Sequence, residues 1–261
     1  MSSVESDYYA FMGYDPEHTR SGLRHYLPWF PDGPVLELAS GRGEFLGLLR
    51  EAGVAASGVD LDEGMVRDAR EAGHDVQLAD ALTALRSRPD DAVQGVFCAH
   101  FVEHLDPEAL QAVVTESARV LAPGGHFVAA TPNAGCLSVI GHDFWVDPTH
   151  VRPYDPRLLA FFCSAAGLEV VETGANPRNC GGPPPATLPP QVHVDPDLRP
   201  QVVAALEGTT GPWHAFGHLV GVLEERLRAT QAELGALRQS YASLLARLYP
   251  PNEVYVVARA R

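Results

Sequence analysis

The sequence is poor in several features that would assign it to a class of protein at once. It has only four cysteines, and none of them show the Cys-x-x-Cys spacing of zinc and redox sites. It lacks an apolar run of about 18 residues, so neither a membrane-spanning helix nor a membrane partner is expected. The amino end is polar and acidic, unlike a signal peptide. These absences predict a cytoplasmic protein with free thiols.

Basic residues are also scarce. Lys and Arg number 19 against 33 Asp and Glu, which gives a formal net charge of −14 at pH 7. Proteins that bind nucleic acids neutralise phosphates with clustered cations, so we expect no nucleic-acid partner. The length of 261 residues suits one α/β domain with additions, or two small domains.

The stretch Pro34–Leu49 tells most about the fold and the ligand. It starts with apolar residues typical of a buried parallel strand, turns at residues 39–43, and continues with apolar residues at helical spacing. This order is typical of a nucleotide-binding crevice. A dinucleotide site would need glycine at position 46, which is leucine, and Glu44 would repel a pyrophosphate. With Glu37 inside the strand, the turn instead suits S-adenosylmethionine (SAM), which has an ammonium group and no phosphate.

These residues resemble motif I of the class I SAM-dependent methyltransferases, with Ala39 where that family most often has glycine. The likeness continues in the strings LRHYLPWF, FVEHL, VLAPGGHFVAATPN and DPTHVRP. Together they resemble a bacterial group of methyltransferases associated with polysaccharide and O-antigen synthesis, and small-molecule tailoring enzymes share the motifs. The resemblance implies SAM as the cofactor and a hydroxyl of a saccharide or small-molecule metabolite as the acceptor.

Alternating strands and helices predict an α/β fold with a doubly wound, mostly parallel sheet. The resemblance implies the seven-stranded, Rossmann-like sheet of the methyltransferases, with an antiparallel last strand and a long helix inserted before it. Residues 123–125, Pro-Gly-Gly, are interpreted as a turn. The strands are expected at residues 35–38, 54–60, 75–81, 91–100, 127–131, 168–172 and 253–258.

Four segments follow from this pattern. Residues 1–30 are rich in aromatic side chains and are expected to form a helical lid, most of it as one or two helices packed on the core, with Tyr8 or Tyr9 covering the ligand. The remaining segments are a SAM-binding core at 31–174, an excursion rich in Gly and Pro with a long helix at 175–249, and the final strand of the core at 250–261.

The long helix, residues 215–248, has apolar or near-apolar residues at alternating steps of four and three. This spacing is a heptad seam, and an exposed seam of this size favours a homodimer through the helix. The alternative is that the seam packs on its own domain or on the excursion.

Acids at strand ends are expected to bind SAM. Asp60 ends the second strand, where a carboxylate accepts hydrogen bonds from ribose hydroxyls, and the helix N-cap is assigned to Asp62. Asp80 resembles the acid that accepts from the adenine amino group in this family, with a solvated turn residue as the alternative. Met65 is expected against the adenine. The complete set expected to contact SAM is Glu37, Ala39, Gly41, Gly43, Asp60, Leu61, Met65, Asp80, Ala81, Ala99 and His100.

Histidines gather where the fourth strand ends, the point that faces the methyl group in this fold. His100, His104 and His150 are the candidate catalytic residues, because a histidine can accept a proton from a hydroxyl at neutral pH. Together with Glu103 they also form a candidate set of ligands for a divalent ion, for which iron, manganese and zinc suit the donors better than magnesium. The alternative is that Glu103 and His104 cap the next helix and that His150 is structural.

The sequence therefore predicts an enzyme, a SAM-dependent methyltransferase that acts on a hydroxyl or another nucleophile of a saccharide or small molecule. A second hypothesis is that the chain binds SAM without methylating anything, either as a non-catalytic partner or in metal-dependent chemistry of another kind. The sequence leaves the acceptor open.

Overall fold

The computed structural model describes residue 13, residues 15–179 and residues 212–261, with the side chains from residue 220 onward in the last range. The tyrosines expected in a lid, Tyr8 and Tyr9, and most of the Gly- and Pro-rich excursion therefore lie outside the described residues. The chain divides into two units, and their described parts are residues 13, 15–179 and 249–261 in the first and residues 212–248 in the second.

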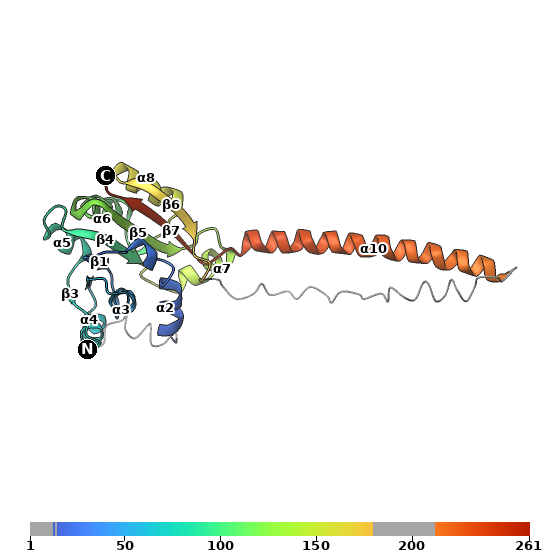
Figure 1. Ribbon diagram of the computed structural model, residues 1–261, viewed down its shortest axis with the longest axis horizontal. Coiled ribbons are helices and arrows are strands. Elements are labelled where there is room, and N and C mark those ends of the chain that lie inside the picture. The colour runs from blue at the N-terminus through green and yellow to red at the C-terminus, as the bar shows by residue number, and fades with distance from the viewer. Residues whose placement is uncertain (1–12, 14, 180–211) are drawn as a thin grey trace. The chain divides into compact units, whose positions relative to one another are not determined.

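The first unit is built on a seven-stranded sheet with the order β3-β2-β1-β4-β5-β7-β6 (Figure 1). Every pairing from β3 to β5 is parallel, whereas β7 runs antiparallel to both of its neighbours. The predicted doubly wound, mostly parallel sheet with an antiparallel last strand is confirmed. The strands are β1 Val35–Leu38, β2 Ala56–Asp60, β3 Val76–Leu78, β4 Val93–Ala99, β5 Leu121–Pro132, β6 Glu169–Ala175 and β7 Glu253–Arg259.

Aspartates begin most of the helices that cover this sheet. Asp15, Asp62, Asp80, Asp106 and Asp155 are N-caps whose side chains accept from backbone N–H groups of the first turn. Proline follows three of these caps directly, at the position where a helix needs no N–H donor. The helices are α2 Pro16–Leu23, α3 Glu44–Glu51, α4 Glu63–Glu71, α5 Ala81–Arg86, α6 Pro107–Val120, α7 Leu137–Gly141 and α8 Pro156–Ala165, with 3-10 helices η1 Leu27–Trp29, η2 Val102–His104 and η3 Asp143–Trp145.

The sheet is covered on both faces, by α5, α6 and α8 on one and by α2, α3 and α4 on the other (Figure 1). Alternate side chains of β1 enter the two cores, with Leu36 in one and Val35 in the other. The second core is aromatic, since Phe45 and Phe97 stack with ring centroids 4.0 Å apart. This double burial explains why the central strands read as unbroken apolar runs.

Two expected boundaries were wrong. The third strand ends at Leu78 instead of position 81, because the Asp80 carboxylate accepts from the backbone N–H of Thr83 and starts α5. Residues 123–125 lie inside β5 and do not form a turn. Their backbone pairs with the end of the chain, since Gly124 N–H donates to Ala260 O and Ala260 N–H donates to Gly125 O.

The second unit contains α10, Pro212–Leu248, which confirms the predicted long helix before the last strand. At 37 residues it is about 55 Å long. Among the described helices, α10 included, none combines the length and the apolar character that a bilayer-spanning helix needs.

Candidate functional site

A cavity of about 620 Å³ opens at the carboxyl ends of the central strands. It is lined by residues that follow β1, β2 and β4, where the strand order reverses between β1 and β4. Such a switch point is where doubly wound sheets bind their ligands. The volume suits a ligand of cofactor size. Of the residues predicted to contact SAM, all but Gly43 line this cavity.

The turn after β1 contains three residues in the left-handed region, Ala39 (φ 51°), Gly41 (φ 51°) and Gly43 (φ 84°). A side chain at Gly41 would meet nothing within 4 Å, so its glycine serves the backbone conformation. A Cβ at Gly43 would instead come within 2.6 Å of the His74 ring. Gly43 therefore meets two requirements, its left-handed φ and the close approach of His74, and it does not line the cavity.

Two acids that line the cavity, Glu37 and Asp60, differ in their hydrogen bonding. Glu37 is 5% exposed, and its Oε2 has no hydrogen-bond partner among the described residues. Burial raises the pKa of Glu37 well above its usual range. Such an orphaned buried carboxyl is destabilising unless a ligand supplies a donor. Asp60 is instead held in place, because it accepts from the backbone N–H of Gly41 and of Asp62, both at 2.8 Å.

Of the two roles predicted for Asp60 and Asp62, the N-cap role of Asp62 is confirmed, and the ribose-binding role of Asp60 stays a prediction. Asp62 is the N-cap of α4 and accepts from Gly64 N at 2.7 Å and Met65 N at 2.9 Å. Asp60 faces the cavity, where burial raises its pKa above the usual value. Next to it, the side chain of Leu61 is 69% exposed, an apolar surface left open at the cavity.

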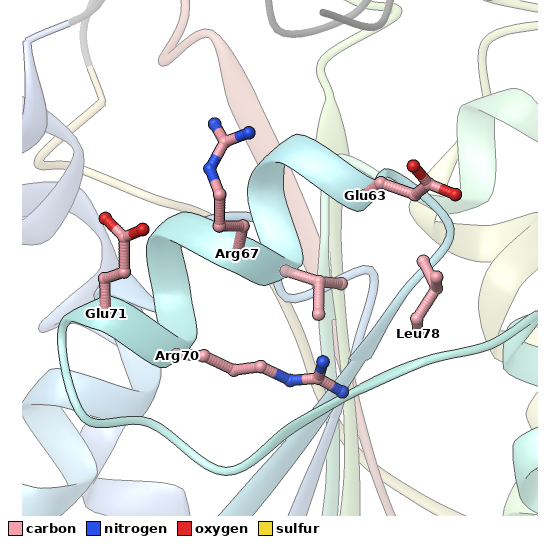
Figure 2. Close-up of a pocket in the computed structure, with 6 residues that line it drawn as sticks. Glu63, Arg67, Arg70, Glu71 and Leu78 are labelled. Carbon is pink, nitrogen blue, oxygen red and sulfur yellow. The ribbon is translucent and has the colours of Figure 1, made fainter. Parts of the chain in front are cut away.

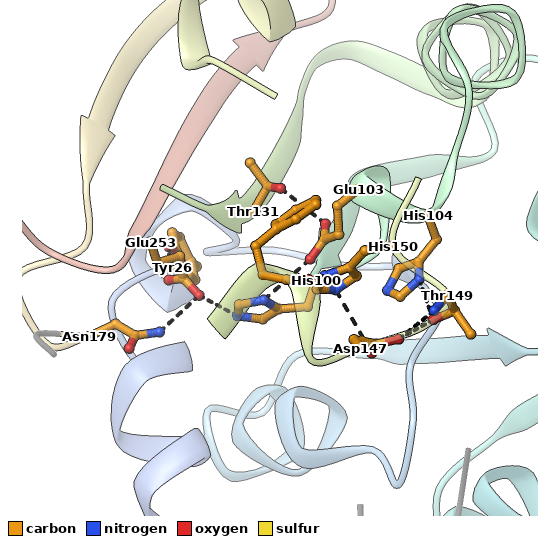
Figure 3. A network of polar contacts seen from close by, with 11 residues as sticks. Tyr26, His100, Glu103, His104, Thr131, Asp147, Thr149, His150, Asn179 and Glu253 are labelled. Carbon is orange, nitrogen blue, oxygen red and sulfur yellow. Dashed lines mark hydrogen bonds and ion pairs between the residues drawn. The ribbon is translucent and has the colours of Figure 1, made fainter. Parts of the chain in front are cut away.

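His100 lies between two carboxylates, as Figure 3 shows. Its Nε2 is 2.7 Å from Glu253 Oε2, and its Nδ1 is 3.4 Å from Glu103 Oε1. Burial alone would lower the pKa of His100, but hydrogen bonds to Glu103 and Glu253 and their charges raise it to about 10. With an acceptor at each nitrogen, the imidazolium is the favoured form at neutral pH. The residue also has φ 52°, a strained conformation that such contacts can hold.

Glu253 is a residue that sequence reasoning missed. It begins β7, is only 3% exposed, and accepts from the Tyr26 hydroxyl, from Asn176 Nδ2 at 2.7 Å and from Asn179 Nδ2 at 3.2 Å, besides pairing with His100 (Figure 3). The only signal in the sequence is one acid at the head of an otherwise apolar strand. The resulting network ties the last strand to η1 and to the end of β4.

The His100 network predicts a stability that depends on pH. The folded chain retains the His100 proton up to about pH 10, whereas the unfolded chain releases it near pH 6.5. This contribution to the free energy of unfolding is fully present below about pH 6.5 and disappears as the pH passes about 10. We expect Tm to decline across this window in the wild type and to decline less in His100→Asn, which cannot be protonated. Parallel Tm profiles for the two proteins would contradict the assignment.

A second group of side chains faces the cavity from η2 and from the loop before α8. One ligand atom each of Glu103, His104 and His150 lie within 4.8 Å of one another. Thr149 Oγ1 donates to Asp147 Oδ1 at 2.5 Å, because a carboxylate can only accept. The same oxygen lies 2.9 Å from His104 Nδ1, which must therefore be the donor. This chain of hydrogen bonds leaves the lone pair of His104 Nε2 available.

His150 is oriented in the same way. Its Nδ1 donates to the carbonyl of Phe144 at 2.6 Å, so its Nε2, 3.8 Å from Asp147 Oδ2, carries the lone pair. Glu103 is fully buried and accepts from Thr131 Oγ1 at 3.0 Å, while its Oε1 faces the His100 ring, 3.4 Å from Nδ1.

The predicted set of four candidate metal ligands is thus brought together only in part. Glu103, His104 and His150 form one group, whereas His100 is not part of it and pairs with Glu253. The idea that Glu103 and His104 cap the following helix was wrong, because Asp106 is the N-cap of α6.

A second hollow lies on the outer side of α4, beside the edge strand β3 (Figure 2). Charged side chains from α4 surround it, and Arg70 Nε donates to the carbonyl of Val76 at 2.8 Å. None of the residues predicted to bind SAM or to act in catalysis lines it. Its lining residues are Glu63, Val66, Arg67, Arg70, Glu71 and Leu78.

Comparison with known proteins agrees with this geometry. Residues 36–129 match a family model described as a methyltransferase domain. A protein of Mycolicibacterium smegmatis named "Probable S-adenosylmethionine-dependent methyltransferase" is 33% identical over 139 residues, which are 53% of this chain and 53% of that protein. The alignment therefore spans about half the length of this curated relative.

Solved structures extend the likeness over the chain. A SAM-dependent methyltransferase from Archaeoglobus fulgidus matches with a TM-score of 0.70 and 25% identity, covering 98% of this chain and 100% of that one. A complex that contains the Haloferax volcanii Trm112 methyltransferase activator matches with a TM-score of 0.58 and 19% identity, over 95% of this chain and 92% of that one. The second match is a likeness of fold alone.

Proposed function

We propose that this chain, whose core contains a SAM-dependent methyltransferase domain, moves a methyl group to a hydroxyl of a neutral saccharide or small-molecule metabolite. The observation that carries the proposal is that His104, whose Nδ1 donates to Thr149 Oγ1, lines the same cavity as Glu37 and Asp60. SAM supplies an electrophilic methyl group when it is bound. The residues of the chain bind the two reactants, exclude water and accept the proton of the hydroxyl.

The residues at the carboxyl ends of β1, β2 and β3 fit SAM. Glu37 has an unpartnered buried oxygen that an ammonium group would satisfy, which removes the penalty of leaving it orphaned. Asp60 is fixed by two backbone donors and suits a pair of ribose hydroxyls. Leu61 and Met65 suit an adenine ring through apolar contact. Asp80 suits the adenine amino group, because only its Oδ1 caps α5 and Oδ2 remains to accept a hydrogen bond.

His104 is the residue proposed as the base. Thr149 and Asp147 hold the proton on Nδ1, which keeps Nε2 as the acceptor, in the manner of an oriented catalytic histidine. Hydrogen bonds from Thr149 lower the pKa of Asp147 in spite of its partial burial, so Asp147 stays ionised as His104 cycles between its two forms. Thr149 and Asp147 are positioning residues, because they act through His104.

The charge of the cavity favours a neutral acceptor. The acids in its lining outnumber the cations, because Glu37, Glu44, Asp60, Asp80, Asp143, Asp147 and Glu253 face only Arg42, Arg178 and the imidazolium of His100, which pairs with Glu253. A phosphorylated or carboxylated acceptor would meet this excess of negative charge. A saccharide offers the hydroxyls that such acids and Asn179 can bind without that repulsion.

A panel of acceptors with labelled SAM tests the substrate class. Neutral mono- and oligosaccharides are compared with their phosphorylated forms, and incorporation of label is measured. We expect incorporation into neutral acceptors and at least about tenfold less into the phosphorylated forms of the same sugars, the factor that corresponds to about 1.4 kcal/mol. Equal or better use of phosphorylated sugars would contradict the proposal of a neutral acceptor.

A second candidate is that Glu103, His104 and His150 hold a divalent ion. Each histidine donates its Nδ1 proton to an oxygen, to Thr149 or to the carbonyl of Phe144, which is how metal-bound histidines are oriented. Oε1 of Glu103 would supply the carboxylate ligand and would then be shared between the ion and His100 Nδ1, which lies 3.4 Å away. Such an ion would lower the pKa of a bound acceptor hydroxyl. The same methylated product would then form without His104 acting as the base.

Elemental analysis separates the two candidates. If the group binds an ion, we expect about one iron, manganese or zinc per chain, loss of turnover on chelation, and loss of both ion and turnover in His150→Ala. Glu253→Gln, outside the group, serves as the matched control and should retain the ion. If His104 is instead a metal-free base, a chelator should leave turnover unchanged and turnover should rise with pH as the base deprotonates.

A further inference from the structure

Among the side chains described from residue 220 to 248, exposed apolar surface gathers along one stripe of α10. Among exposed large apolar side chains of the described residues, seven of fifteen belong to this helix. The stripe consists of the heptad seam, with Leu237 65% exposed and Leu223 57% exposed. Its described members are Val220, Leu223, Leu227, Thr230, Leu234, Leu237, Tyr241, Leu244 and Leu248.

The spacing of the seam indicates what kind of element packs against it. Steps of three and four alternate without interruption from residue 220 to 248, an average of 3.5 residues, over about 43 Å of helix. A stripe with this period faces a second helix of the same period along its whole length. Elsewhere in the sequence there is no heptad repeat of comparable length that could supply that helix.

We infer that α10 pairs with α10 of a second copy of this chain in a two-stranded coiled coil. A homodimer brings the same surface to both sides of a two-fold axis, so each seam meets a seam of identical period and length. With Leu227 and Leu234 at a positions, Glu233 occupies a g position and Arg238 the following e position. In a parallel pair these positions bring Glu233 of one copy next to Arg238 of the other, and the two-fold axis repeats this complementary contact.

The seam also carries two less apolar residues, Thr230 at d and Tyr241 at a. Polar groups at seam positions reduce the stability of a coiled coil while restricting its register. The remaining seam positions are leucine or valine, so the pair buries six leucines from each helix.

Light scattering after gel filtration of the full-length chain tests the inference. At tens of micromolar we expect the wild type to have twice the mass of one chain, which is 28.1 kDa. Leu237→Glu places a charge in the centre of the seam and should give the monomer. Ala232→Glu introduces the same charge at an exposed f position on the other side of the same helix and should remain dimeric.

Two further measurements show whether Leu237→Glu damages the first unit instead of only separating the helices. SAM affinity and the melting of the core, measured on Leu237→Glu, should match the wild type, because the cavity belongs to the other unit. A monomeric wild type would overturn the inference. So would a Leu237→Glu variant that stays dimeric, or an Ala232→Glu variant that dissociates equally.

Discussion

Replacing His104 with alanine is expected to lower kcat for methyl transfer by about 10²–10⁴-fold, the usual contribution of a positioned general base. The physical reason is that His104 Nε2 is the proposed acceptor of the hydroxyl proton, while its Nδ1 is held by Thr149. SAM affinity should stay close to that of the wild type, since Glu37 and Asp60 are untouched. Single-turnover rates and calorimetric titration with SAM measure the two quantities separately.

Thr149 provides the matched control for this role. Thr149→Ser keeps the hydroxyl that accepts from His104 and donates to Asp147, so kcat should be largely retained. Thr149→Val keeps the shape and removes the hydroxyl, so kcat should fall with little change in KM, and the pH profile of kcat should move. Equal rates in the serine and valine variants, or full turnover in His104→Ala, would refute the proposed base.

Replacing Asp60 with alanine is expected to weaken SAM binding by at least about 10²-fold, because two hydrogen bonds to a charged carboxylate are worth about 1.5–3 kcal/mol each. The carboxylate is positioned for a ligand, with Gly41 N–H and Asp62 N–H donating to it at 2.8 Å. The loss should appear in the dissociation constant for SAM, measured by calorimetry, and should not appear as a loss of folded protein.

Asp62→Ala is the control for Asp60. It removes the N-cap of α4, which should reduce the free energy of unfolding by about 0.5–2 kcal/mol. Its effect on SAM affinity should be much smaller than that of Asp60→Ala, because its carboxylate is engaged by Gly64 N and Met65 N. If the two variants lose affinity equally, Asp60 does not have the ribose role proposed for it.

Local signals in the sequence were sufficient for much of the fold, and all but one of the residues predicted to contact SAM line a single cavity. The strand, turn and helix of residues 34–49 are adjacent in the chain. Such features depend on backbone geometry within a few residues, which is why they can be predicted. The seven-stranded sheet then followed from the alternation of strands and helices and from the family resemblance.

The partners of the histidines could not be predicted in this way. His100 meets Glu253, which is 153 positions away, and His104 meets Thr149 across 45 positions. Residue types near the end of β4 indicate that histidines gather there, but the tautomer of each ring is set by what the fold places against it. The approach of His74 to Gly43, across 31 positions, could not be predicted either, although the positive φ of this glycine is typical of a turn.

The fate of the methyl group shows most directly whether this chain transfers it from SAM to a hydroxyl. Wild-type enzyme is incubated with methyl-labelled SAM and neutral saccharide or hydroxylated acceptors, and products are analysed by mass spectrometry and NMR. We expect label on an acceptor oxygen in the wild type and roughly 10²–10⁴-fold slower appearance of the same product with His104→Ala. SAM that binds and is consumed without a labelled O-methyl product, or label found on nitrogen or carbon, would contradict it.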